Sequence, residues 1–224
     1  MQQVTDPLAL LPAAWQPKLA EIDPLHILYA PGEMICQSGS YVAGFHLVAS
    51  GVVCDLFTCI DRTPGACELL GPGDLLGIDL FADPRNARSP SICKAITAVS
   101  LIFYERRAFE QAILDDPSLS AFVLHHIAGR HSTARRSAFP GIPDTRLLAR
   151  VLKRLGECCG SRDQDGSIEL PPEISLRTLA EICGWNRRRL RDALREFSNL
   201  EDTGNGIRFL PEVTARLASS TSRG

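Results

Sequence analysis

Five arginines within nine residues mark the stretch of the chain best suited to bind a polyanion. They are Arg187, Arg188, Arg189, Arg191 and Arg195. A guanidinium group carries a permanent charge and pairs bidentately with phosphate oxygens or with the edge of a guanine. Segment 174–197, ISLRTLAEICGWNRRRLRDALREF, is therefore predicted to contact nucleic acid.

Two short helices joined by a turn are expected to position these arginines. Ser175 is a predicted N-cap for the first helix, Gly184 supplies the turn, and Asn186 is a predicted N-cap for the second. Apolar residues recur along the second helix at i, i+3, i+4 and i+7: Leu190, Ala193, Leu194 and Phe197. The pattern predicts a helix-turn-helix whose second helix enters the major groove of double-stranded DNA. The alternative is an ordinary helical hairpin with a solvated basic face.

Basic charge gathers in the part of the chain that holds this motif. Residues 144–224 contain 14 Lys and Arg against 12 Asp and Glu, whereas residues 1–143 contain 10 against 14. The formal net charge of −2 does not argue against DNA, because a phosphate backbone meets the local field of the docking face. No apolar run approaches the length of a membrane span, and the N-terminus lacks the features of a signal peptide. We therefore expect a cytoplasmic protein without a membrane partner.

Eight cysteines are dispersed through the chain without an export signal, so we expect reduced thiols rather than a disulfide framework. Three of them are redox candidates. Cys183 is predicted beside the turn of the motif, where an oxidation product would meet DNA, and the pair Cys158-Cys159 follows a predicted helix. The alternative for Cys183 is a small buried residue that packs two helices, and the alternative for the pair is a helix end without a role.

The rest of the chain shows two further patterns. Short apolar runs punctuated by glycines, from about residue 26 to 105, predict a sandwich, barrel or jelly roll. Helices are expected over 106–114 and from Pro117 to about Ala138, and FPGIPD at 139–144 is expected to be a hinge before a further helix. Residues 202–211, DTGNGIRFLP, predict the hairpin wing of a winged helix.

This order of parts, with PGDLLGIDLF at 72–81 and the helix-turn-helix, resembles the CRP/FNR family of bacterial transcription regulators. The resemblance covers residues from about 22 to 217. It implies an α+β fold with an N-terminal cyclic-nucleotide-binding-like β-roll (jelly roll), a long dimerisation helix and a C-terminal winged helix-turn-helix. The implied boundaries are 1–116 for the effector domain, 117–143 for the helix and hinge, and 144–224 for the DNA-binding domain.

The resemblance also implies a function. A homodimer would bind a palindromic operator, under allosteric or redox control, and would contact RNA polymerase if it activates. The dimerisation helix has its firmest apolar positions at Leu119, Phe122, Val123 and Ile127. The alternative is a ligand-binding β-roll module that acts on a partner protein, with a cyclic nucleotide as effector. No nucleophile–base pair and no metal-ligand spacing emerges from the sequence, so an enzyme is not expected.

The effector pocket implied by the resemblance departs from the pattern of nucleotide-binding members. In those proteins a Gly-Glu pair holds the ribose, and a later Arg-Ser or Arg-Thr pair holds the cyclic phosphate. Here Ile78 stands in place of the glutamate, and Pro90 removes an N–H from the phosphate cradle. The pocket residues that the resemblance implies are Gly77, Asp79, Arg88, Ser89 and Thr133. A cyclic nucleotide is a candidate effector that the sequence does not favour. The alternative is that Arg88 pairs with a nearby carboxylate, Asp79 or Asp83.

Metal and haem are also considered as effectors. His125, His126 and His131 lie on the predicted dimerisation helix, but the last two are five residues apart and diverge around it. Haem is therefore a candidate effector that the sequence does not favour. The alternative is that these histidines are solvated or lie at an interface. Oxygen-sensing members of the family carry a tight group of cysteines near the N-terminus, whereas the first cysteine here is Cys36. An FNR-type iron–sulfur cluster is not expected.

Overall fold

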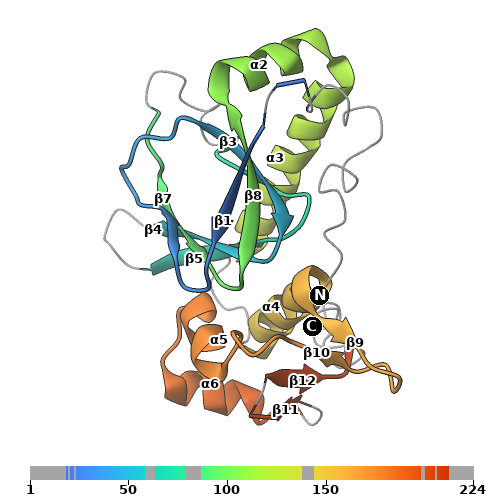
Figure 1. The fold of residues 1–224 in the computed structure, drawn as a ribbon. Helices are drawn as coiled ribbons and strands as arrows, with labels where there is room; N and C mark the ends of the chain where they lie inside the picture. Colours follow the sequence, from blue (N-terminus) through green and yellow to red (C-terminus); the bar gives the residue numbers. More distant parts are fainter. Residues whose placement is uncertain are drawn as a thin grey trace.

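The computed structural model of the 224-residue chain describes residues 19, 21–22, 24–58, 64–78, 87–137, 144–197, 200–204 and 206–211. A β-roll lies above a smaller C-terminal domain of helices and short strands, and a long helix runs along the roll (Figure 1). No helix within these residues is long and apolar enough to cross a bilayer.

Eight short strands build the roll as two antiparallel sheets, one ordered β1-β8-β3-β6 and the other β2-β7-β4-β5. Their bounds are Leu25–Tyr29 (β1), Met34–Cys36 (β2), Gly44–Ser50 (β3), Val53–Thr58 (β4), Pro64–Leu70 (β5), Leu75–Leu76 (β6), Ser91–Ala95 (β7) and Val99–Glu105 (β8). Side chains alternate between the two faces of a strand. In β4, Val53 and Asp55 are therefore buried inside the roll, while Cys54 packs outward against the C-terminal domain.

Two helices follow the roll. Helix α2 (Arg106–Asp115) is capped by Glu105, whose side chain accepts a hydrogen bond from the Ala108 amide at 3.0 Å. Helix α3 (Pro117–Ser137) begins where Asp116 accepts hydrogen bonds from the amide and the hydroxyl of Ser118, at 2.9 and 2.7 Å. The break predicted before Pro117 is confirmed.

The four apolar positions of α3 that the sequence singles out contribute to the core of the roll. Leu119, Phe122, Val123 and Ile127 pack inward with Phe45 and Phe109 of the roll's own core. The apolar face of α3 covers the core of the roll, because an amphipathic helix packs its apolar side chains away from water. The outer face carries Ala121, Leu124 and Ala128, all exposed.

Within the described residues, the C-terminal domain combines three helices with a four-stranded sheet ordered β11-β12-β10-β9. Its elements are α4 (Asp144–Cys159), β9 (Ser161–Arg162), β10 (Ile168–Glu169), α5 (Leu176–Cys183), α6 (Arg187–Leu194), β11 (Leu200–Asp202) and β12 (Ile207–Phe209). The predicted wing is confirmed, since β11 pairs antiparallel with β12. Of the predicted hinge, residues 139–143 lie outside the described residues.

The two domains share part of their core. Val52 and Leu69 of the roll belong to the same buried cluster as Leu148 and Leu152 of α4. A Cβ placed on Gly71 would fall 2.9 Å from the Cβ of Cys158, so the chain of the roll approaches the end of α4 closely. This approach requires a residue without a side chain.

A disulfide joins Cys54 and Cys67 on the neighbouring strands β4 and β5. The expectation of reduced thiols is therefore wrong for this pair. The two cysteines are 13 residues apart in sequence, and the antiparallel register brings them together by pairing Cys54 with Leu69 and Leu56 with Cys67. Dispersal along a sequence says little about distance once strands pair.

Candidate DNA-binding surface and effector pocket

The helix-turn-helix has the caps and turn that the sequence predicts. Ser175 Oγ accepts a hydrogen bond from the Thr178 amide at 3.2 Å, and Asn186 Oδ1 accepts one from the Arg189 amide at 2.9 Å. Gly184 ends α5 with φ of 66°, a left-handed conformation that favours glycine. These three residues fix where each helix begins or ends, and thereby where α6 points.

Helix α6 divides into a buried and an exposed face. Leu190, Ala193 and Phe197 are at most 6% exposed, and Leu194 is half-buried. All five predicted arginines are exposed. The apolar stripe predicted from the sequence is therefore confirmed, and it leaves the basic face open to solvent.

The arginines differ in how they are held. The guanidinium of Arg189 lies over the Trp185 ring, 5.1 Å from its centroid, and Arg195 pairs with Asp192 of the same helix at 3.1 Å. Within the described chain no ion pair or hydrogen bond holds the side chains of Arg187, Arg188 and Arg191. In Figure 1, α5 lies next to the roll and α6 lies further from it, and the side chains of these three arginines are exposed to solvent.

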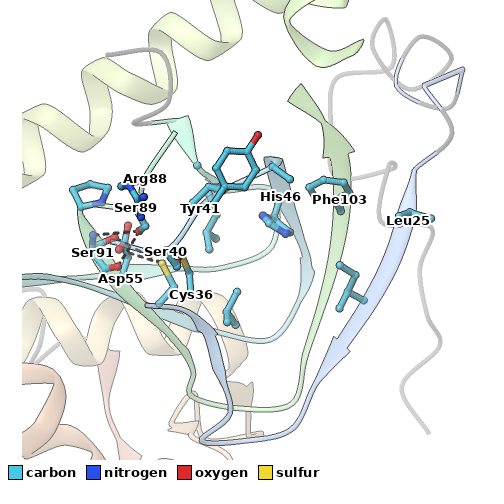
Figure 2. A pocket seen from close by; sticks show the side chains of 18 residues that line it. Leu25, Cys36, Ser40, Tyr41, His46, Asp55, Arg88, Ser89, Ser91 and Phe103 are labelled. Atoms are coloured by element: carbon cyan, nitrogen blue, oxygen red, sulfur yellow. Dashed lines mark hydrogen bonds between the residues drawn. The ribbon is translucent and has the colours of Figure 1, made fainter. Parts of the chain in front are cut away.

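A cavity of about 320 Å³ opens inside the roll, between its two sheets. Figure 2 shows its polar end, with Arg88, Ser89, Ser91, Ser40 and Asp55 grouped together. The other end is lined by His46, Phe103 and Leu25 (Figure 2), and the aliphatic side chains of Ile27 and Leu76 also line the cavity. A volume of this size suits a small organic molecule.

Three of the predicted pocket residues, Gly77, Arg88 and Ser89, line this cavity. Arg88 Nη1 donates a hydrogen bond to the Gly39 carbonyl at 2.6 Å, and its predicted pairing with a carboxylate stays a prediction. Asp79 and Asp83 lie outside the described residues, as does the side chain of Thr133. Pairing of the loop before β3 with the Arg88 segment creates this contact, which spans 49 residues of sequence.

The polar groups beside Arg88 are engaged within the protein. The Ser89 amide donates to the Ser40 carbonyl at 3.0 Å, and Ser89 Oγ donates to the Ser91 carbonyl at 2.9 Å. Pro90 follows without an N–H. Ile78, which stands where the resemblance expects a ribose-binding glutamate, is 6% exposed. Within the described residues, the Ser89 amide is already bound, Pro90 has no N–H and position 78 carries no carboxylate, so these three positions lack the pattern that the resemblance expects for a cyclic nucleotide.

Asp55 is one of the pocket residues that the sequence did not predict. It lines the cavity from β4, is 2% exposed, and accepts a hydrogen bond from the Cys93 thiol at 3.4 Å. Burial, followed by the charge of Asp55, raises the pKa of Cys93 and keeps that thiol protonated. The signal in the sequence was the alternation of GVVCDLF, which places Asp55 on the same face as Val53.

The redox candidates are partly buried and differ in their surroundings. Burial raises the pKa of Cys158 to about 11 and that of Cys159 to about 12, and Cys159 Sγ donates to the Leu155 carbonyl at 3.2 Å. Thiols protonated at neutral pH are poor nucleophiles. Cys183 is half-buried and packs against the core of the C-terminal domain, as its structural alternative predicts.

His126 connects three parts of the fold and was not predicted to do so. Its Nε2 accepts a hydrogen bond from the Leu75 amide at 3.1 Å and lies 3.8 Å from Asp74 Oδ1. Asp74 also accepts from the Gly71 amide at 2.8 Å and pairs with Arg154 of α4. The roll, the long helix and the DNA-binding domain therefore meet at Asp74. His125 is exposed, and no group of three or more metal-ligating side chains occurs within the described chain.

Comparisons with known proteins agree with this arrangement. Residues 26–116 match the model of the cyclic nucleotide-binding domain. The HTH-type transcriptional regulator Cmr of Mycobacterium tuberculosis is 26% identical over 171 residues, which are 75% of this chain and 64% of that protein. The chain thus spans a little less than two thirds of that relative's length.

Solved structures share the fold over most of the chain. FixK2 from Bradyrhizobium japonicum has a TM-score of 0.69 at 17% identity, covering 89% of this chain and 99% of its own. A CRP/FNR-family transcriptional regulator from Thermus thermophilus has a TM-score of 0.66 at 18% identity, covering 88% of this chain and 100% of its own. The β-roll, long helix and winged helix-turn-helix are therefore one known architecture.

Proposed function

We propose that this chain, which belongs to the CRP/FNR family of transcription regulators, binds specific DNA sequences as a homodimer and changes its affinity in response to a signal in the β-roll. The observation that carries the proposal is the outer face of α6, where Arg187, Arg188 and Arg191 are exposed on a helix fixed by a cap and a buried stripe. Such a regulator acts in the cytoplasm and, as an activator, contacts RNA polymerase.

The N-terminal turn of α6 is proposed to read bases. Residues near the start of a recognition helix contact base edges in the major groove. Arg187 and Arg188 occupy these positions, while Arg191 and Arg195 lie one and two turns further along, where phosphates are within reach. Arg189, stacked on Trp185, and the caps Ser175 and Asn186 hold the motif in position.

The dimer is proposed to form through the outer face of α3. Leu124 is 66% exposed there, between the small residues Ala121 and Ala128, which allow two helices to approach closely. Two-fold pairing through this face would present two α6 helices to successive major grooves, on the order of 34 Å apart.

Selection from a randomised duplex library with the full chain tests the proposal. We expect the selected duplexes to share a palindromic site. A scrambled duplex should not compete with that site for binding to the protein. A chain that selects no sequence contradicts the proposal and favours a β-roll module that acts on a partner protein.

Light scattering tests the dimer face. Leu124→Glu is expected to convert the dimer to a monomer and to weaken operator binding by more than about tenfold, because bivalent contact is lost. Leu114→Glu is a matched control, because Leu114 lies on α2 and is 78% exposed. Equal effects of the two substitutions would count against the α3 interface.

A further inference from the structure

We propose that Cys54 and Cys67 are a reversible thiol–disulfide modification site, and that their redox state sets how firmly the β-roll holds the DNA-binding domain. The inference rests on the proposed function, which places the chain in the cytoplasm and makes operator binding its output. Three features of the fold support it: the disulfide itself, its position on the face of the roll that packs against α4 and α5, and two polar contacts from that face to the same helices.

The disulfide joins two strands that already pair through their backbones. Strands β4 and β5 are neighbours in one antiparallel sheet, so the bond between Cys54 and Cys67 is not needed to bring them together. Both cysteines are half-buried, so a small dithiol in the solvent reaches the bond. A disulfide in the cytoplasm is usually transient, because the thiols of that compartment reduce it. We therefore interpret this disulfide as one state of a reversible pair rather than as a permanent staple.

The strand register places both cysteines on the outer face of the sheet. Residues that stand opposite each other in an antiparallel pair share a face, and Cys54 stands opposite Leu69 while Cys67 stands opposite Leu56. Leu69 belongs to the buried cluster that the roll shares with α4 and α5, and both cysteines pack against that cluster. In Figure 1, β4 and β5 lie on the side of the roll nearest the C-terminal domain. The disulfide is therefore part of the support on which the helix-turn-helix rests.

Two polar contacts connect the same face to the helices. Arg154 Nε of α4 donates a hydrogen bond to the Leu69 carbonyl of β5 at 3.2 Å. Lys94 of β7 stands opposite Cys54, and its Nζ lies 4.0 Å from Oε2 of Glu181 in α5. Each cysteine thus lies within two residues, along or across the strands, of a residue that contacts the DNA-binding domain. A change at the disulfide reaches α4 through β5 and α5 through β7.

Reduction proceeds by thiol–disulfide exchange with a dithiol. One thiolate of the dithiol attacks a sulfur of the pair and forms a mixed disulfide, which releases one cysteine; its second thiol then attacks the mixed disulfide and releases the other cysteine. The dithiol leaves as its own disulfide, and the two cysteines gain two electrons and two protons. An oxidised dithiol reverses each step. Burial raises the pKa of Cys158 to about 11 and that of Cys159 to about 12, so these protonated thiols compete poorly for exchange.

The bond is expected to favour DNA binding. It connects residues 13 positions apart and so limits the conformations open to the segment between them. A stiff β4–β5 pair holds α4 and α5 in one arrangement, and less ordering is then required when α6 enters the major groove. Loss of the bond loosens this support, so the reduced chain should bind its operator more weakly.

A redox titration of the full chain tests the switch. Mixtures of reduced and oxidised dithiothreitol set the redox state, and alkylation followed by peptide mass spectrometry gives the fraction of the Cys54–Cys67 disulfide. Fluorescence anisotropy gives the operator dissociation constant, and hydrogen exchange without DNA reports on α4 and α5. We expect reduction to weaken operator binding on the order of fivefold or more, as is typical of coupled sites, and to speed exchange in both helices, with one midpoint for all three measurements.

Variants assign the effect to this pair of cysteines. Cys54→Ser/Cys67→Ser should bind the operator as the reduced wild type does in every mixture. Cys36→Ser is a matched control, because Cys36 is a half-buried free thiol on β2, and it should keep the wild-type ratio of dissociation constants. Cys183→Ser should keep that ratio as well, which separates the pair from the thiol beside the turn. Thermal midpoints report folding, and if the double variant does not fold, the coincidence of midpoints in the wild type decides.

The proposal is overturned if operator affinity is equal in both states, if reduction strengthens binding, if the midpoints differ, or if the ratio persists in the double variant or disappears in Cys183→Ser. Sequence-specific binding that ignores the redox state leaves the proposed function intact. Absence of specific binding in either state counts against the proposed function, and hydrogen exchange then decides the switch, because unchanged exchange in α4 and α5 on reduction overturns it.

Discussion

Helix α6 and strand β4 are both amphipathic, and each carries charge on one face. The charged face of α6 is exposed to solvent, whereas that of β4 is buried. Helix α6 buries Leu190 and exposes Arg188, whereas β4 buries Asp55 and packs Cys54 against the neighbouring domain. An outward arginine keeps its hydration, while an inward carboxylate requires a partner. The exposed face of α6 is thus built from side chains that water satisfies, whereas the cavity of the roll contains a carboxylate that the protein itself must satisfy.

The largest expected effect concerns whether the roll and the C-terminal domain are stable independently of each other. Leu152→Ala and Leu47→Ala remove equivalent side chains, each fully buried, from the DNA-binding domain and the roll. Each is expected to lower the free energy of unfolding by about 2–5 kcal/mol. Because Leu152 shares a core with Val52 and Leu69, we expect Leu152→Ala also to speed hydrogen exchange in β4 and β5. Exchange accelerated only beyond residue 144 would show that the shared core carries no coupling.

The pH dependence of stability tests the interior of the roll. The pKa of His46 is lowered to about 4 by burial, below the ordinary value of 6.5, so the unfolded chain binds this proton first. His46 therefore leaves stability constant above pH 6.5 and lowers it as the pH falls toward 4, by about 2–3 kcal/mol at full effect.

Denaturant unfolding at a series of pH values measures this loss. His46→Gln is expected to flatten the curve between pH 6.5 and 4 relative to wild type, whereas His26→Gln, at an exposed position on β1, should not. Identical curves for all three proteins would mean that another group controls acid sensitivity.

The base preference of variants tests which arginine of α6 reads the DNA sequence. Arg188→Ala is expected to relax specificity at one base pair of each half-site, at a cost of about 1–3 kcal/mol. Arg195→Ala is a matched control, because Arg195 is exposed on the same helix but already paired with Asp192. It should weaken all sequences slightly and alike. Binding to single-base operator variants measures both, and an unchanged base preference in Arg188→Ala removes that residue from direct readout.

The smallest expected effect concerns the contact between the two regions. Asp74→Ala removes the acceptor that Arg154 and the Gly71 amide share, and we expect a loss of about 1–2 kcal/mol because Arg154 is partly solvated. Glu157→Ala, whose ion pairs are exposed and close to 4 Å, should cost less than about 0.5 kcal/mol. If Asp74 transmits the signal, its substitution should also change operator affinity, whereas Glu157→Ala should not.

Local patterns predicted the DNA-binding motif in detail. Ser175, Gly184 and Asn186 act within a few residues of their own positions, so the sequence is sufficient to place them. The stripe of Leu190, Ala193 and Phe197 follows from helical periodicity in the same way.

Predictions that depended on distant partners were less accurate. The stripe on α3 was identified correctly as apolar, and the structure adds that it packs against the core of the roll. The hydrogen bond of Arg88 to the Gly39 carbonyl, 49 residues away, was not predicted. Strand pairing also joins Cys54 to Cys67, which dispersal along the chain did not suggest.

The sequence alone determined which segments form helices and strands, where the recognition helix begins, and that its arginines lie opposite an apolar stripe, because these properties depend on residues within one or two turns. Only the tertiary structure decided which face of α3 is buried, that Asp55 lies inside a cavity, and that Asp74 meets His126 and Arg154. These contacts join residues between 50 and 80 positions apart, as with Leu75 and His126 or Asp74 and Arg154, and no local pattern encodes such a distance.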